Sequence, residues 1–127
     1  MAVMEPRKQE LDPNGIDAHQ PGAKLDAGKL IAGELMTSFS NSLTAMMEVA
    51  TFGANKYTRK GFLSVPNGEE RYLDALIRHL LKHGSGEELD PETNLPHLHH
   101  ALWNMAAVVE VRLRNKKTQP KNPVDYL

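Results

Sequence analysis

The sequence predicts an all-α protein, a bundle of three or four helices. Apolar residues recur at helical spacing in three segments, at residues 40–57, 69–83 and 97–114. No segment shows the alternating pattern of a strand that is buried on one face. Segments with glycine, proline and polar residues separate the three predicted helices, at residues 58–68 and 84–96. These observations together indicate helices that pack through apolar stripes.

A further short helix is predicted at residues 28–38, and it ends at the serines that begin with Ser38. In the segment 40–57, Ser40 or Asn41 can cap the N-terminus of the helix. The predicted buried stripe of this helix consists of Leu43, Met46, Met47, Ala50 and Ala54.

The two later helices have longer apolar stripes. In the segment 69–83 the stripe consists of Leu73, Leu76, Ile77, Leu80 and Leu81. The segment 97–114 is apolar over much of its circumference, which is typical of a central helix. Its apolar residues are Leu98, Leu102, Met105, Val108 and Val109.

The chain of 127 residues fits one domain with two extensions. Residues 1–22 and 115–127 contain prolines and few apolar residues, so we expect a flexible N-terminal arm and a C-terminal tail. The helical body at 23–114 is small for a monomer that carries a polar site. We therefore expect a homo-oligomer, a dimer or a tetramer, in which a partner surface completes the core.

Composition excludes several classes of function. The net charge is −1 at pH 7 and there is no basic stripe, so bulk nucleic-acid binding is not expected. Cysteine is absent, which excludes disulfides and thiolate metal sites. No apolar run approaches the roughly 18 residues of a membrane span, and no signal peptide is recognisable. We therefore expect a cytoplasmic protein without a membrane partner.

Residues 68–104 contain an unusual density of ionisable groups, with seven acidic side chains, five histidines and two arginines. On the helix 69–83, Glu70, Asp74 and Arg78 lie along one edge of the apolar stripe, and His79 lies on the other edge. A carboxylate at such an edge can hold a metal ion, and an arginine can hold a phosphate. The alternative is a ladder of i,i+4 charges on a solvated face.

The last helix begins with a polar stripe. His97, His100 and Asn104 stand at i, i+3 and i+7, and the same stripe continues downstream as apolar core. Unpaired polar groups on an inward face are costly, so these three should contact a ligand, a metal ion or one another. The alternative is a satisfied polar layer or a helix cap.

Acidic residues crowd the loop before the last helix. Glu87, Glu88, Asp90 and Glu92 all lie there. The dipole of the helix favours acids at its N-terminus, and Glu92 with Thr93 can cap it. A hard cation such as Mg²⁺ or Mn²⁺ would explain the crowding more fully.

The end of the helix 40–57 is ambiguous. Glu48 projects away from the methionine stripe and alone would be a surface residue. Lys56 and Tyr57 come at the C-terminus of the helix, where a lysine needs no ligand.

Neither a GxxxxGK[ST] loop nor a GxGxxG loop is present to hold phosphates.

Four segments, AKLDAGKL, EVATFGANKY, RYLDALIRHL and GEELDPETNLPHLHHALWN, carry a resemblance to a known family. Over about residues 23–109 the chain resembles the phage-encoded N-terminal domain of dATP/dGTP diphosphohydrolases, which is associated with all-α pyrophosphohydrolases of the MazG type. Asn94 departs from the family pattern, which has glycine there. The MazG motifs ExxE and ExxD are incomplete. Ala45 stands three residues before Glu48, and Arg71 stands three residues before Asp74, where the motifs have an acidic residue.

The resemblance implies a metal-dependent enzyme of phage nucleotide metabolism in the cytoplasm of an infected bacterium. It would convert a purine deoxynucleoside triphosphate to the monophosphate and pyrophosphate. The implied catalytic residues are Glu48, Asp74 and His79. The implied ligands of Mg²⁺ or Mn²⁺ are Glu48, Asp74, Glu87 and Asp90, and the implied substrate-binding residues are Lys56, Tyr57, Arg78, His97, His100 and Asn104.

Two other functions stay open at this point. The incomplete acid motifs favour a protein that binds or sequesters a nucleotide without turnover. A purely structural helical oligomer would require that no nucleotide changes the melting temperature.

Overall fold

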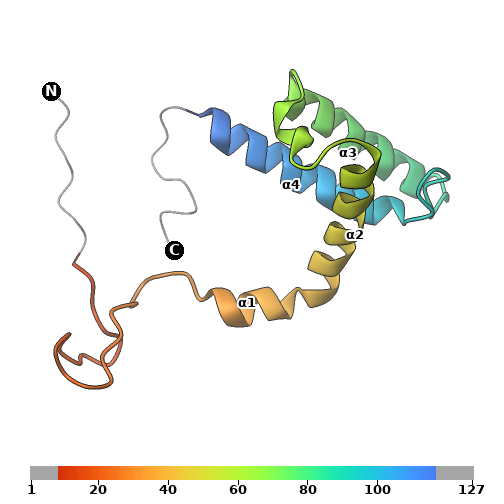
Figure 1. Ribbon diagram of the computed structural model, residues 1–127. Coiled ribbons are helices and arrows are strands. Elements are labelled where there is room, and N and C mark those ends of the chain that lie inside the picture. The colour runs from red at the N-terminus through yellow and green to blue at the C-terminus, as the bar shows by residue number, and fades with distance from the viewer. Residues whose placement is uncertain (1–8, 117–127) are drawn as a thin grey trace, which may run out of the picture. The chain divides into compact units, whose positions relative to one another are not determined.

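The computed structural model describes residues 9–116, and these residues form helices, turns and loops (Figure 1). Within that range there is no strand, and one isolated antiparallel bridge joins Leu89 to Pro96. The all-helical prediction is confirmed. The described helices are α1 (Ala32–Ser38), α2 (Ser40–Lys56), the 3-10 helix η1 (Gly61–Ser64), α3 (Gly68–Gly84) and α4 (His97–Asn115).

Both predicted extensions lie partly outside the described residues, which begin at residue 9 and end at residue 116. No helix within residues 9–116 combines the length and the apolar character needed to cross a bilayer. The MazG-like bundle and the oligomer remain predictions.

The described residues before Gly33 form a unit of their own, organised around the buried carboxylate of Asp12. One carboxylate oxygen of Asp12 accepts hydrogen bonds from the amides of Asn14 (2.7 Å) and Ile16 (3.2 Å). The other accepts one from the amide of Lys24, at 2.8 Å. The hydrogen bond from Lys24, with those from Ile16 and Asn14, lowers the pKa of Asp12.

The second unit contains the helices and the core. α3 and α4 pack along each other, and α2 contacts α4 (Figure 1). The apolar core is made of small and branched side chains, which allow the helices to approach closely. It consists of Ala45 and Val49 from α2, Leu76 from α3, and Ala101, Ala107, Val108 and Val111 from α4. α4 contributes most of the buried residues, as expected for a central helix.

The predicted face of α2 was wrong in part. Ala45 and Val49 are the buried residues, and Met47 is 50% exposed. The other predicted residues are half-buried, namely Leu43, Met46, Ala50 and Ala54. The small side chain of alanine suits the contact with α4 better than the bulk of methionine. The predicted caps were wrong as well, because Phe39 occupies the N-cap position and no side chain caps the helix there.

Apolar side chains on α3 and α4 are more exposed than their spacing predicts. Of the predicted stripe of α3, Leu76 alone is buried. Within the described part of the chain, two groups of large apolar side chains stay open to solvent. They are Leu73, Ile77, Leu80 and Leu81 on α3, and Leu98, Leu102, Met105 and Val109 on α4.

Candidate functional site

A cleft of about 1020 Å³ lies between the C-terminal part of α2, α3, α4 and the loop before α4. Five cationic side chains line it, against three acidic ones. This excess of positive charge suits an anionic ligand. The cations are Lys56, Arg59, Lys60, Arg71 and Arg78, and the acids are Asp74, Asp90 and Glu92.

Aromatic side chains form one wall of this cleft. The ring of Trp103 meets those of Phe62 and Tyr72 edge to face, with 5.5 Å between centroids in each pair. The hydroxyl of Tyr72 donates a hydrogen bond to the carbonyl of Phe62, at 2.7 Å, and burial raises its pKa. Tyr57 also lines the cleft and is 72% exposed, and the ammonium group of Lys56 lies over its ring, 5.2 Å from the centroid.

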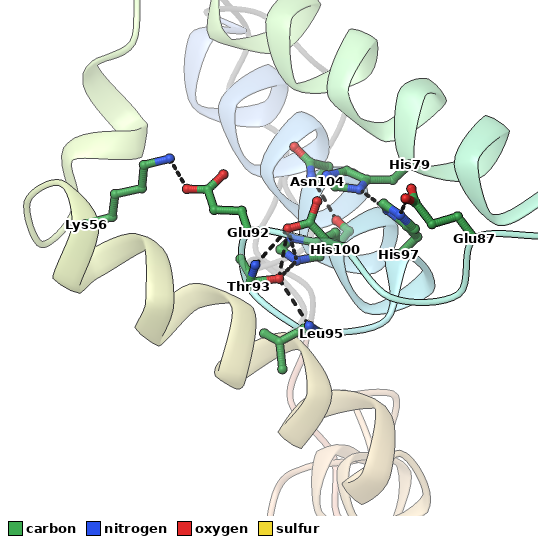
Figure 2. A network of polar contacts seen from close by, with 10 residues as sticks. Lys56, His79, Glu87, Glu92, Thr93, Leu95, His97, His100 and Asn104 are labelled. Atoms are coloured by element: carbon green, nitrogen blue, oxygen red, sulfur yellow. Dashed lines mark hydrogen bonds and ion pairs between the residues drawn. The ribbon is translucent and has the colours of Figure 1, made fainter.

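His79, His97 and Glu87 form a chain of polar contacts (Figure 2). His79 Nδ1 lies 2.8 Å from His97 Nδ1, and His97 Nε2 lies 2.9 Å from a carboxylate oxygen of Glu87. His97 is only 2% exposed. A carboxylate only accepts hydrogen bonds, so the pattern assigns the proton of neutral His97 to Nε2 and leaves a lone pair on Nδ1. His79 then holds the proton between the two rings on its own Nδ1.

Asp90 organises a second set of contacts beside this chain. One of its oxygens accepts hydrogen bonds from the amide (3.0 Å) and the hydroxyl (3.1 Å) of Thr93. The hydroxyl oxygen of Thr93 lies 2.7 Å from His100 Nε2. The ring of His100 stacks on that of His79, with 4.6 Å between centroids and 8° between planes. The side-chain amide of Asn104 donates to the carbonyl of His100, at 2.8 Å.

The surroundings of these groups set their charges. Burial lowers the pKa of His79 and of His100, and neighbouring histidines lower both further, so both rings are neutral at about pH 7. Burial raises the pKa of Asp90, but the hydrogen bonds from Thr93 and the nearby His100 and His79 outweigh it, and the net pKa is lowered. Asp90 is therefore a carboxylate beside neutral imidazoles.

Three potential metal ligands come together at this point. One donor atom from each of His79, Asp90 and His97 lies within 4.8 Å of the others, and no other such group occurs within residues 9–116. The predicted set of four carboxylates, Glu48, Asp74, Glu87 and Asp90, is not assembled.

The four carboxylates lie in different places because Glu48 and Asp74 come from different helices, whereas Glu87 and Asp90 come from the loop between α3 and α4. Asp74 lines the cleft, whereas Glu48 lines a separate hollow of about 520 Å³. Glu87 is engaged with His97, and Asp90 with Thr93. Their predicted roles as ligands stay predictions.

The predicted substrate-binding residues fall into two groups. Lys56, Tyr57, Arg78, His100 and Asn104 all line the cleft. His97 instead lies buried between His79 and Glu87.

Glu92, expected to cap α4, forms an ion pair with Lys56, and its hydrogen bond raises the pKa of the lysine (Figure 2). Pro96 occupies the N-cap position of α4 without a side-chain hydrogen bond.

Sequence reasoning missed five residues of the cleft. Arg59 and Lys60 follow α2, outside the segments that were singled out, although two adjacent cations are a visible signal. Arg71 lies within residues 68–104 but was not chosen as a phosphate ligand. Phe62 and Trp103 belong to the aromatic wall. Only the packing of η1 against α3 shows that Phe62 reaches it.

Comparison with known proteins gives one family. The family model described as dATP/dGTP diphosphohydrolase, N-terminal, matches residues 19–121. This range includes every residue of the cleft and the group of His79, Asp90 and His97. Neither the curated proteins nor the solved structures provide a match. The matched range covers most of the chain, and the protein belongs to the dATP/dGTP diphosphohydrolase N-terminal family.

Proposed function

We propose that the protein hydrolyses purine deoxynucleoside triphosphates, dATP or dGTP, to the monophosphate and pyrophosphate. The observation that carries this proposal is the cleft itself. It joins five cations, an aromatic wall and neutral histidines beside the carboxylate of Asp90. The name of the family indicates the same reaction.

The cations of the cleft would hold the triphosphate. Arg78 and Arg71 come from α3 and can each bind phosphate oxygens through two parallel hydrogen bonds. Lys56 adds a point charge at the end of α2. The purine would stack on an aromatic ring, for which the exposed ring of Tyr57 and the ring of Trp103 are both available.

The reaction needs an attacking water, a leaving group and an acceptor for a proton. Water attacks the α-phosphorus, the bond to the bridging oxygen breaks, and pyrophosphate leaves. The cations stabilise the charge that develops on the oxygens. The cluster of His79 and Asp90, which borders the cleft, provides the acceptor for the proton of the water.

Magnesium or manganese would enter this reaction bound to the phosphates of the nucleotide. Asp74 and Asp90 are the carboxylates of the cleft that could face such an ion, since hard cations prefer oxygen ligands. The oxygen-rich set expected for a resident magnesium ion is not assembled, and the chain offers two histidines and one carboxylate instead.

The direct test is the release of pyrophosphate from dATP and dGTP in the presence of magnesium or manganese. The variant Asp74→Asn should lower the rate about 100-fold or more, because it removes a carboxylate that would face the metal ion bound to the phosphates. Glu70→Gln is the matched control, since Glu70 lies one helical turn before Asp74, is exposed and does not line the cleft. Equal rates for both variants would contradict the role of Asp74.

A binding protein without turnover is the second candidate. It is favoured by the position of Glu48, which the structure places in a different hollow from Asp74. Trp103 is the single tryptophan of the chain and lines the cleft, so its fluorescence reports occupancy directly. A nucleotide that changes this fluorescence but yields no pyrophosphate would establish binding and reject the hydrolase.

A further inference from the structure

We infer that His79, Asp90 and His97 form a binding site for one transition-metal ion, in which Glu87 orients His97. The sequence predicted a set of carboxylates for the metal ion, and it predicted separately that His97 would contact a ligand, a metal ion or another polar group. The pairing of His97 with His79 comes from the packing of α3 against α4. The existence of the site follows from the arrangement of these side chains, whereas the use of the ion in catalysis rests on the proposed function.

The donor atoms already converge. His79 comes from α3, His97 from the first position of α4 and Asp90 from the loop between them. One donor atom of each lies within 4.8 Å of the other two. Two ring nitrogens face each other across 2.8 Å, held by a single proton. This proton occupies the place where an ion would bind.

The rings need only a small adjustment to accept an ion. Two nitrogens that each lie about 2.0–2.1 Å from one tetrahedral ion are about 3.3 Å apart. The rings must therefore separate by about 0.5 Å, and the proton on Nδ1 of His79 must be replaced by one on Nε2 of the same ring, so that Nδ1 presents a lone pair to the ion. The neutral ring is the form of histidine that binds metals, and burial lowers the pKa of His79.

Glu87 provides the support that metal-binding histidines usually have. In metal sites the ring nitrogen that is not bound to the ion donates its proton to a carboxylate or carbonyl, which fixes the orientation of the ring. His97 Nε2 makes this contact with Glu87, at 2.9 Å, although His97 is buried (Figure 2). The carboxylate thereby turns Nδ1 of His97 towards His79.

The ligand set predicts the kind of ion. Imidazole nitrogens suit zinc, cobalt, nickel, iron or manganese, whereas magnesium prefers sites made of oxygen. Two nitrogens and one carboxylate leave at least one coordination position open, as in catalytic sites. His79 and Asp90 also line the cleft, so the open position is accessible to a ligand there. An ion bound there would lower the pKa of a water molecule that it binds.

Cobalt binding to the metal-free protein, without nucleotide, tests the inference. We expect one Co²⁺ ion per chain, seen as visible absorption bands, and displacement of that ion by Zn²⁺ but not by a large excess of Mg²⁺. His79→Asn and Asp90→Asn should abolish binding at the same concentrations, with the helical circular dichroism retained. Glu87→Gln should weaken binding about 10- to 100-fold, because it orients a ligand without contacting the ion.

His83→Asn is the matched control. His83 lies one turn after His79 on α3, is exposed and takes no part in the cluster, so the variant should bind cobalt as the wild type does. Nitrogen NMR of the wild type adds a measurement that needs no variant. Addition of Zn²⁺ should shift Nδ1 of His79 and His97 and leave His83 unchanged.

Three results would overturn the inference. The first is that no stoichiometric cobalt binding is seen, and the second is that binding survives His79→Asn and Asp90→Asn. The third is that Zn²⁺ shifts the NMR signals of histidines away from the group of His79, Asp90 and His97. The assay keeps this inference separate from the proposed function. Cobalt bound through these residues without any release of pyrophosphate would reject the hydrolase and keep the metal site. Hydrolysis by a protein that binds no cobalt would reject the metal site and keep the hydrolase.

Discussion

At the scale of single residues, the unusual feature is that three imidazoles share one partly buried space. His79 contacts His97 through nitrogen and stacks on His100. Their alignment on α4 predicted that His97 and His100 would contact a ligand, a metal ion or each other. The partner from α3 was not predictable, because it is 18 residues away and depends on how α3 and α4 pack.

The charge state of these rings leads to a pH prediction for the metal-free protein. The pKa values of His79 and His100 are lowered by burial, and the ordinary value of about 6.5 applies to the unfolded chain. Their contribution to stability is therefore complete above about pH 6.5. As the pH falls below that value, the unfolded chain takes up protons before the folded protein does, and stability is lost.

Melting temperatures in a chelator at about pH 7.5 and 5.5 measure this effect. The wild type should melt lower at the acidic pH, and His79→Gln should show a smaller drop. His83→Gln, with its exposed side chain, should behave as the wild type does. An unchanged drop in His79→Gln would show that other groups control the acid response.

At the scale of elements, the positions of the helices were predictable and their contacts were not. Periodicity and the glycine-rich segment at 84–86 placed α2, α3 and α4 within a few residues of their observed bounds. The buried faces of α2 and α3 could not be read in the same way, because packing against α4 buries only part of each apolar stripe and leaves the rest exposed. η1 was expected to be loop, since four residues are too few to show a period.

The link between η1 and α3 gives a prediction about stability. The hydroxyl of Tyr72 is partly buried and donates to the carbonyl of Phe62. Tyr72→Phe should lower the free energy of unfolding by about 1 kcal/mol, measured by urea denaturation. Tyr57→Phe is the control and should stay within about 0.5 kcal/mol of the wild type, because that side chain is largely exposed. Equal losses would contradict a specific role of the contact.

At the scale of the whole molecule, the described body leaves apolar stripes on two helices open to solvent. On α4 these residues recur at i, i+4, i+7 and i+11, the spacing of a seam between helices. The stripe consists of Leu98, Leu102, Met105 and Val109, each between 39% and 46% exposed. Large exposed apolar patches mark interaction sites. The expected homo-oligomer therefore stays a prediction, now with a specific surface.

Sedimentation measures the association. We expect the wild type to form a dimer or tetramer at micromolar concentration, and Leu102→Lys combined with Met105→Lys to shift it to the monomer. Glu110→Lys introduces the same side chain on α4 outside the stripe and should leave the oligomer intact. A monomeric wild type would show that this stripe serves another purpose.

The ion pair between Lys56 and Glu92 has a consequence for how the cleft fills. It joins two residues that are 36 positions apart in the sequence and that both line the cleft. A phosphate group of the nucleotide would compete with the carboxylate of Glu92 for the ammonium group of Lys56. A phosphate that takes the place of Glu92 leaves that carboxylate to the solvent, and breaking such an exposed ion pair costs little free energy. Binding of a nucleotide should therefore release Glu92 from Lys56, and a spectroscopic label beside Glu92 would follow that release.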